Sequence, residues 1–315
     1  MIFFDAHCDI LSQIHTAGDL FSNARQWDAR RALSNGPFIQ VFSCFAENRE
    51  TRGKEMQSQL KMAVSAESKY PDKLKIIRSQ KDLDDAVDSK SATKVYGMLE
   101  AEGAEILGRS LSELNRCYDM GLRILTLAWN YDNEVCDSAA EQRRHNGLSD
   151  FGRQVVEKAQ ALGIVIDVSH SSDKTFEDVM GITHKPVIAS HSNARALCGH
   201  RRNLTDAQIK AVAATGGVIG INFYSRFLKN TGNANSKDII RHIEYIAALA
   251  GVSSVGFGCD FDGCDLLPAG IRGVEDLGRV TEALLRLNYS EEDVGAIAGG
   301  NFIGLMKRTL PLSKP

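Results

Sequence analysis

Residues 164–170, IVIDVSH, and residues 186–192, PVIASHS, share one pattern: a short apolar run ends in a histidine. Val and Ile dominate both runs, which is typical of strands that are buried on both faces of a parallel sheet. The two histidines, His170 and His191, fall where the strands are expected to end. Because the carboxyl ends of parallel strands meet at one edge, this pattern brings two imidazoles to the same part of the fold.

Six further runs of the same kind bring the expected number of strands to eight. They are residues 2–6, 38–45, 94–101, 123–129, 218–224 and 254–260. Segments with helical spacing of apolar residues lie between the runs, at 55–70, 110–121, 149–163, 204–217 and 236–251. Eight strands that alternate with helices predict an α/β fold, a (β/α)8 TIM-like barrel. An open doubly wound sheet is the alternative, although no GxGxxG motif follows the first run.

Composition narrows the class of protein. The chain has 315 residues, of which 43% are hydrophobic, and a formal net charge of −3. No linker or internal repeat divides it, so we expect a single barrel domain over residues 1–315. No basic run suggests a nucleic-acid partner, and no apolar stretch reaches the roughly 18 residues of a membrane span. The seven cysteines are scattered without a CxxC pair, which favours reduced thiols and a cytoplasmic location.

Histidines and carboxylates follow five of the eight expected strands. They are His7, Asp9, Glu100, Glu102, His170, His191, Asp260 and Asp262. Strand residues two apart point to the same side, so His7 and Asp9 are predicted to reach one ion together. Imidazole and carboxylate ligands suit Zn, Mn or Fe better than Ca. A carboxylate can bridge two ions, and such a site produces hydroxide at neutral pH and polarises a carbonyl.

A single histidine at a strand end is more often a structural hydrogen-bonding group than a metal ligand. Three such histidines, with acids on further strands, favour the metal site. Asp5 lies deeper in the first strand and is expected to orient a ligand from outside the site. The long connections 10–37 and 130–148 are expected to be functional or mobile.

The order of short motifs resembles the renal or membrane dipeptidases, the zinc dipeptidases of peptidase family M19 with amidohydrolase-like barrels. The resemblance covers nearly the whole chain, from DAHCD (5–9) through EG (102–103), NGLSDFG (146–152), IDVSH (166–170), PVIASHS (186–192), RRNLTD (201–206), NFY (222–224) and GCDFDG (258–263) to GGNF (299–302). Each motif is short, but the ordered set is specific. It implies a metal-dependent dipeptidase that hydrolyses small dipeptides, L–D dipeptides included, through a hydroxide activated by two zinc ions.

The resemblance also implies a role for each matched residue. His7 and Asp9 would hold one zinc ion, His170 and His191 the other, and Glu102 would bridge them. Asp260 would act as the acid/base that passes a proton to the leaving amine. Arg202 would bind the substrate's carboxylate, a task that suits a guanidinium fork; a surface salt bridge is the alternative for this arginine. A homodimer is left open.

The chain departs from the mammalian members at one position. A histidine that contacts the substrate carbonyl in those proteins is replaced here by Trp129, and Asn130 is a candidate substitute. Trp129, Asn130 and Tyr224 are therefore expected at the substrate. Trp129 could also simply pack the pocket wall. The alternative function is a related amidohydrolase that acts on N-acyl amino acids or another small amide. A barrel that only binds a small molecule, without catalysis, would be expected to lack metal-ligating residues or Asp260. This chain has both.

Overall fold

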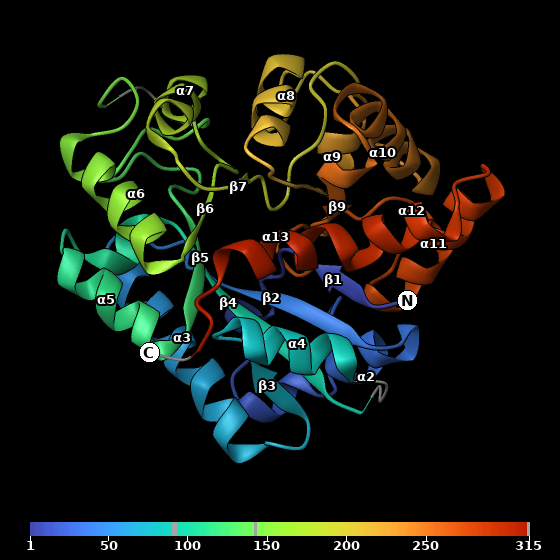
Figure 1. The fold of residues 1–315 in the computed structure, drawn as a ribbon, viewed down its shortest axis with the longest axis horizontal. Helices are drawn as coiled ribbons and strands as arrows, with labels where there is room; N and C mark the ends of the chain where they lie inside the picture. Colours follow the sequence, from blue (N-terminus) through green and yellow to red (C-terminus); the bar gives the residue numbers. More distant parts are fainter. Residues whose placement is uncertain (90–92, 142–143, 314–315) are drawn as a thin grey trace.

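The fold is a parallel barrel surrounded by helices, seen in a computed structural model that describes residues 1–89, 93–141 and 144–313 (Figure 1). The strands are β1 (Phe3–Asp5), β2 (Phe38–Cys44), β3 (Leu74–Ile76), β4 (Val95–Glu102), β5 (Leu122–Thr126), β6 (Val165–Asp167), β7 (Val187–Ile188), β8 (Ile219–Ile221) and β9 (Val255–Phe257). All eight predicted strands are present, most of them shorter than the apolar runs, and β3 was not predicted.

The strands pair in the order β7-β6-β5-β4-β2-β1-β9-β8, with every pair parallel. A bridge between Ala189 and Ile219 joins the two ends of this order, so the sheet nearly closes into a barrel. Strand β3 stands outside the ring and pairs with the first half of β4. The (β/α)8 barrel prediction is confirmed, and the open sheet is not observed.

Helices fill the connections. The α-helices are α1 (Ile10–Gln13), α2 (Ala29–Ala32), α3 (Arg52–Lys69), α4 (Gln80–Asp88), α5 (Leu111–Met120), α6 (Asp150–Leu162), α7 (Asp173–Ile182), α8 (Asp206–Ala214), α9 (Ser225–Leu228), α10 (Ser236–Ala250), α11 (Leu277–Arg286), α12 (Glu291–Gly295) and α13 (Asn301–Thr309). Local capping explains their bounds: Ser149 accepts a hydrogen bond from the Gly152 amide at the start of α6, and Gly163 ends the same helix with φ 82°. The connection 10–37 contains α1 and α2.

The barrel interior is apolar at the end opposite the strand carboxyl termini. One buried cluster joins inward side chains such as Phe4, Met98 and Ile124 to residues of α13. Phe302 of α13 stacks on Phe4 with ring centroids 5.2 Å apart. Helix α13 crosses this end of the strands in Figure 1. The packed floor leaves the other end of the barrel for polar side chains.

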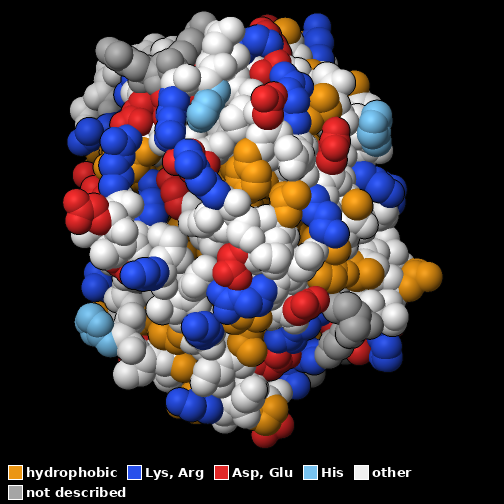
Figure 2. Space-filling view, turned by 90° about the vertical axis from the view of Figure 1, so that its left-hand side faces the viewer, with side chains coloured by type: hydrophobic (Ala, Val, Ile, Leu, Met, Phe, Trp, Pro, Cys, Tyr) orange, Lys and Arg blue, Asp and Glu red, His pale blue; other side chains and the backbone are white. Residues whose placement is uncertain are grey.

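Outside, charged residues of both signs mix with small hydrophobic groups on the face drawn in Figure 2. Within the described ranges, no helix combines the length and the apolar character needed to traverse a bilayer. The expectation that residues 1–315 form a single domain stays a prediction.

Candidate metal centre and active site

The first strand delivers His7 and Asp9 differently from the simple alternation predicted for them. Strand β1 ends at Asp5, the chain bends at Ala6, and Asp9 adopts φ −92° and ψ 16° immediately before helix α1. The two side chains nevertheless converge, with His7 Nε2 3.4 Å from Asp9 Oδ2. A common face of the strand cannot explain this convergence, because the strand ends at Asp5. The bend at Ala6 and the start of helix α1 bring the two side chains together.

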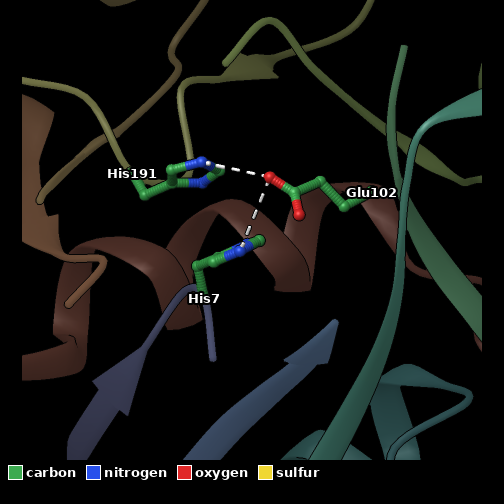
Figure 3. Close-up of side chains that lie close together, drawn as sticks. All are labelled: His7, Glu102 and His191. Carbon is green, nitrogen blue, oxygen red and sulfur yellow. Dashed lines mark ion pairs between the residues drawn. The ribbon is translucent and has the colours of Figure 1, made fainter. Parts of the chain in front are cut away.

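Glu102, the last residue of β4, occupies the centre of the cluster. Its Oε1 lies 3.0 Å from His170 Nε2, 3.5 Å from His191 Nε2 and 3.8 Å from His7 Nε2. In Figure 3, His7 and His191 both point toward one oxygen of this carboxylate, and their rings lie close together, with centroids 3.8 Å apart. Glu102 ends β4, whereas His7, His170 and His191 lie just beyond the ends of β1, β6 and β7, and all four side chains are nearly inaccessible to solvent. Residues predicted on opposite sides of a two-ion site therefore meet at one carboxylate.

Each of the three histidines has its other ring nitrogen occupied. His7 Nδ1 lies 2.8 Å from Glu100 Oε2, His170 Nδ1 3.1 Å from Asn130 Oδ1, and His191 Nδ1 2.7 Å from Ser190 Oγ. Each of these oxygens can accept a hydrogen bond from Nδ1–H. They leave the Nε2 lone pairs directed at the cluster, which is the arrangement of metal-binding histidines.

Three of the candidate histidines and carboxylates hold unusual backbone angles. His170 has φ 64°, Asp260 has φ 61° and Asp262 has φ 66°, the left-handed region that residues other than glycine seldom adopt. Asn222 steadies Asp260 by donating a hydrogen bond of 2.8 Å from Nδ2 to Oδ2. Asp260 Oδ1 lies 4.0 Å from His7 Nε2. Such strain collects at functional sites, where the surrounding contacts hold it in place.

Asp262 does not join the cluster. Both of its carboxylate oxygens accept hydrogen bonds from backbone amides, of Gln26 at 2.8 Å and Trp27 at 3.1 Å. It thereby fastens the connection 10–37 to the loop after β9. Asp5 accepts a hydrogen bond of 2.8 Å from the amide of Cys259, the residue before Asp260. That contact agrees with the outer supporting position expected for Asp5.

The electrostatics of the cluster favour a cation. Burial raises the pKa of Glu102 well above its usual range, and the charge of Asp9 adds to this effect. Burial also raises the pKa of Asp260 to about 6. For His7, burial lowers the pKa but the carboxylates of Glu100 and Asp9 outweigh it, so the net pKa is raised. A positive charge at His7 Nε2, from a proton or a metal ion, relieves this concentration of buried carboxylates.

The residues present fit a metal. His7 Nε2 and Asp9 Oδ1 are buried and have no hydrogen-bond partner among the described residues. Burial lowers the pKa of His170 and of His191 well below the usual value, which leaves these imidazoles neutral and able to coordinate. Two overlapping groups, His7 with Glu102 and His191 and His7 with Asp9 and Asp260, bring ligand atoms within 4.8 Å of one another.

A cavity of about 390 Å³ opens above the cluster. Asp9, Glu102, His170 and Asp260 form its floor, and Trp129, Asn130 and Tyr224 stand in its wall, as do Phe45 and Phe227. Trp129 packs against Phe45 with centroids 4.8 Å apart and edge-on against Tyr131 at 5.2 Å. Asn130 contacts His170. Three of the four predicted substrate-binding residues therefore line this cavity, and Arg202 is not among its lining residues.

Arg202 is buried beside this cavity. Its Nη2 donates to the carbonyl of His191 at 3.3 Å, and its guanidinium lies 5.5 Å from the ring of Phe227. Its Nε has no hydrogen-bond partner and no ion pair joins it to a described carboxylate, although the charges of Asp260, Glu102 and Asp167 act to raise its pKa. Burial lowers the pKa of Arg202 to about 10. A buried guanidinium without an anion is expected to take one from a ligand.

Sequence reasoning missed five residues that support this site: Thr126, Asp167, Ser190, Asn222 and Gly263. Thr126 and Asp167 end strands β5 and β6, and Asn222 directly follows β8, so their places at strand ends were a usable signal. The place of Gly263, packed against Asp9 and Asp260, could not be read from the order of residues.

A nearly closed parallel barrel with histidines and carboxylates gathered beyond its strand ends is the arrangement of a metal-dependent hydrolase. Residues 1–314 match the model of the membrane dipeptidase family, peptidase family M19, and the chain belongs to that family. An uncharacterised dipeptidase of Schizosaccharomyces pombe is 31% identical over 302 residues, covering 88% of this chain and 71% of that protein.

Solved structures agree with this assignment. The M19 metallopeptidase named dipeptidase AC is 25% identical, with a TM-score of 0.87 over 98% of this chain and 99% of that chain. A metallopeptidase of Rhodobacter sphaeroides, 24% identical, shares the fold with a TM-score of 0.89 over 98% of this chain and 99% of that chain. The family and its relatives indicate a metal-dependent hydrolase of peptide bonds, a dipeptidase.

Proposed function

We propose that the chain hydrolyses dipeptides whose amino and carboxyl termini are both free, at a centre of two zinc ions. The observation that carries the proposal is the pairing of a three-histidine cluster around Glu102 with a buried guanidinium, Arg202, that lacks an anion. Both are needed for a dipeptide: the cluster for its peptide bond and Arg202 for its terminal carboxylate.

The division of ligands between the two ions is part of the proposal. His7 Nε2 lies 3.4 Å from Asp9 Oδ2, His170 and His191 contact each other at 3.0 Å, and Glu102 lies within 4 Å of all three histidines. The rings of His7 and His191 also lie close, with centroids 3.8 Å apart. When bound, the ions would polarise the scissile carbonyl and make a water molecule a stronger nucleophile. Zinc is proposed because imidazole and carboxylate donors suit it.

Asp260 is proposed as the acid/base group. It lines the cavity, and Asn222 holds one oxygen while the other faces His7. From this position its carboxylate would accept a proton from the attacking water and donate one to the leaving amine. Asn222 also donates to the carbonyl of His191 at 3.3 Å, which fixes the acid/base group relative to a ligand.

The charge of the cavity favours a dipeptide over an N-acyl amino acid. Glu47 and Asp265 line its outer part, and none of the cavity's described lining residues is a lysine or arginine. Glu47 follows β2, whereas Arg202 follows β7, and these strands lie across the barrel from each other in the strand order. A substrate with its carboxylate at Arg202 thus places its ammonium toward carboxylates. A neutral acyl group carries no positive charge that these carboxylates could attract.

Two finer points belong to the same proposal. L–D dipeptides are included as substrates, and the Rhodobacter sphaeroides structure holds a phosphinate mimic of L-Ala-D-Ala.

A cytoplasmic location is proposed because all seven cysteines are buried with free thiols, as in a reducing compartment. Sedimentation velocity would establish whether the chain forms a homodimer.

The test is a substrate panel on protein loaded with zinc, with bound metal measured on the same sample. The panel pairs L–L and L–D dipeptides with N-acetylated and C-amidated versions of each, and a separate set contains N-acyl amino acids. We expect turnover of the free dipeptides and large losses on both modified sets. Absence of turnover in protein that holds two zinc ions would refute the proposal. Faster hydrolysis of N-acyl amino acids would favour the related amidohydrolase instead.

A further inference from the structure

A chain of buried hydrogen bonds connects two of the proposed metal ligands, His7 and His191, through side chains that do not line the cavity. It begins at His7, whose Nδ1 lies 2.8 Å from Glu100 Oε2. The other oxygen of Glu100 lies 2.6 Å from the hydroxyl of Thr126, and that hydroxyl lies 2.6 Å from Asp167 Oδ2. None of the four side chains is exposed to solvent.

The chain continues from Asp167 to the second pair of histidines. Ser190 donates its hydroxyl to Asp167 Oδ2 at 2.6 Å, and the same hydroxyl lies 2.7 Å from His191 Nδ1. The second oxygen of Asp167 accepts from the backbone amides of Ser169 at 3.0 Å and Ser190 at 2.8 Å. These amides belong to the residues directly before His170 and His191.

We propose that Thr126 and Asp167 are positioning residues that couple His7 to His170 and His191, so that the two sides of the metal centre are ordered as one unit. The inference rests on the proposed metal centre and goes beyond its ligands. The rings of His7 and His191 already lie close, with centroids 3.8 Å apart, and this chain adds a hydrogen-bonded connection between their Nδ1 atoms. Here one threonine hydroxyl is the contact through which the carboxylate of Glu100 meets that of Asp167.

The physical reason lies in what the ligands must do. A hydrogen bond donated by Nδ1 fixes the orientation of an imidazole ring and leaves Nε2 free to bind an ion. Hydrogen bonds buried in a medium of low dielectric constant strengthen one another, and a network can exceed the sum of its parts. A shift of Asp167 would move the backbone before both His170 and His191, and through Thr126 it would reach His7.

The experiment compares Thr126→Val with Thr126→Ser. Valine keeps the shape of threonine and removes the hydroxyl, whereas serine keeps the hydroxyl. Protein freed of metal is titrated with Co²⁺, and its visible absorption reports affinity and ligand geometry. Loss of an outer hydrogen-bonding partner typically weakens metal affinity by about 10- to 100-fold. We expect a loss of this size and an altered Co²⁺ spectrum for Thr126→Val, and near-parental values for Thr126→Ser.

A second pair of variants tests the coupling itself. Ser190→Ala interrupts the same chain at its other end, so its effect and that of Thr126→Val should overlap in the double variant. Fold losses that simply multiply would overturn the coupling, as would a Thr126→Val variant with parental affinity and spectrum. Neither the Co²⁺ affinity nor the visible spectrum depends on hydrolysis of a dipeptide. A parent that binds Co²⁺ normally but cleaves no dipeptide would therefore refute the proposed function and leave this inference standing.

Discussion

Gly263 lies directly against Asp9. A methyl group at Gly263 would fall 2.1 Å from Oδ2 of Asp9 and 2.4 Å from Oδ1 of Asp260. Both distances are far below van der Waals contact, so the loop after β9 can approach these carboxylates only because residue 263 lacks a side chain. The glycine brings the proposed acid/base group and a proposed ligand of the first ion into one compact arrangement.

Gly263→Ala should accordingly weaken metal binding. The added methyl group must displace Asp9 or Asp260, and overpacking of this kind costs about 1–3 kcal/mol. The affinity for zinc should fall. The temperature of thermal unfolding, measured with and without zinc, should drop further below that of the parent when zinc is bound. Gly181→Ala in helix α7 is the control, since a methyl group there meets no atom within 4 Å. Equal metal affinity in the Gly263 variant and the parent would contradict the arrangement.

The roles of Glu102 and Asp260 separate in their variants. Glu102→Ala removes the carboxylate that stands between the histidines, so it should abolish activity and weaken metal binding. Asp260→Asn keeps the size of the side chain and should abolish activity with metal retained. Metal content by elemental analysis and dipeptide turnover on the same samples test both. Loss of metal from the Asp260 variant would make this residue a ligand, as its proximity to His7 and Asp9 allows.

Arg202→Ala should act through the substrate's carboxylate. Hydrogen bonds to charged groups contribute about 1.5–3 kcal/mol, so kcat/KM for a free dipeptide should fall by roughly 10- to 150-fold. The amidated dipeptide should lose much less, because it has no carboxylate to bind. Arg201→Ala, at the exposed neighbouring position, is the matched control. An equal loss on free and amidated substrates would assign Arg202 to structure alone.

The sequence predicted the barrel well because buried parallel strands are continuous apolar runs, and all eight runs formed strands. It predicted the convergence of His7, Glu102, His170 and His191 because strand order fixes where strand ends meet. Strand β3 was missed because Leu74–Ile76 is too short and interrupted by Lys75 to give a periodic signal. The bend at Ala6 and the left-handed angles of His170 and Asp260 depend on tertiary contacts, which local propensity does not encode.

Trp129 is expected to act by packing. Its ring packs against Phe45 and Tyr131, and its centroid lies 6.4 Å from that of the His170 ring. The buried guanidinium of Arg52 lies 5.3 Å from the same centroid. Trp129→Phe retains an aromatic ring and removes the indole N–H, so kcat/KM should stay close to that of the parent. Trp129→Ala should raise KM, because it opens the wall behind the substrate.

Steady-state kinetics on one free dipeptide distinguishes packing from oxyanion stabilisation. Loss of an oxyanion donor lowers kcat by about 100- to 1000-fold. A fall of that size in Trp129→Phe, with KM unchanged, would show that the indole N–H stabilises the developing charge. Near-parental kcat in Trp129→Phe together with a raised KM in Trp129→Ala would instead place Trp129 in the wall that shapes the pocket.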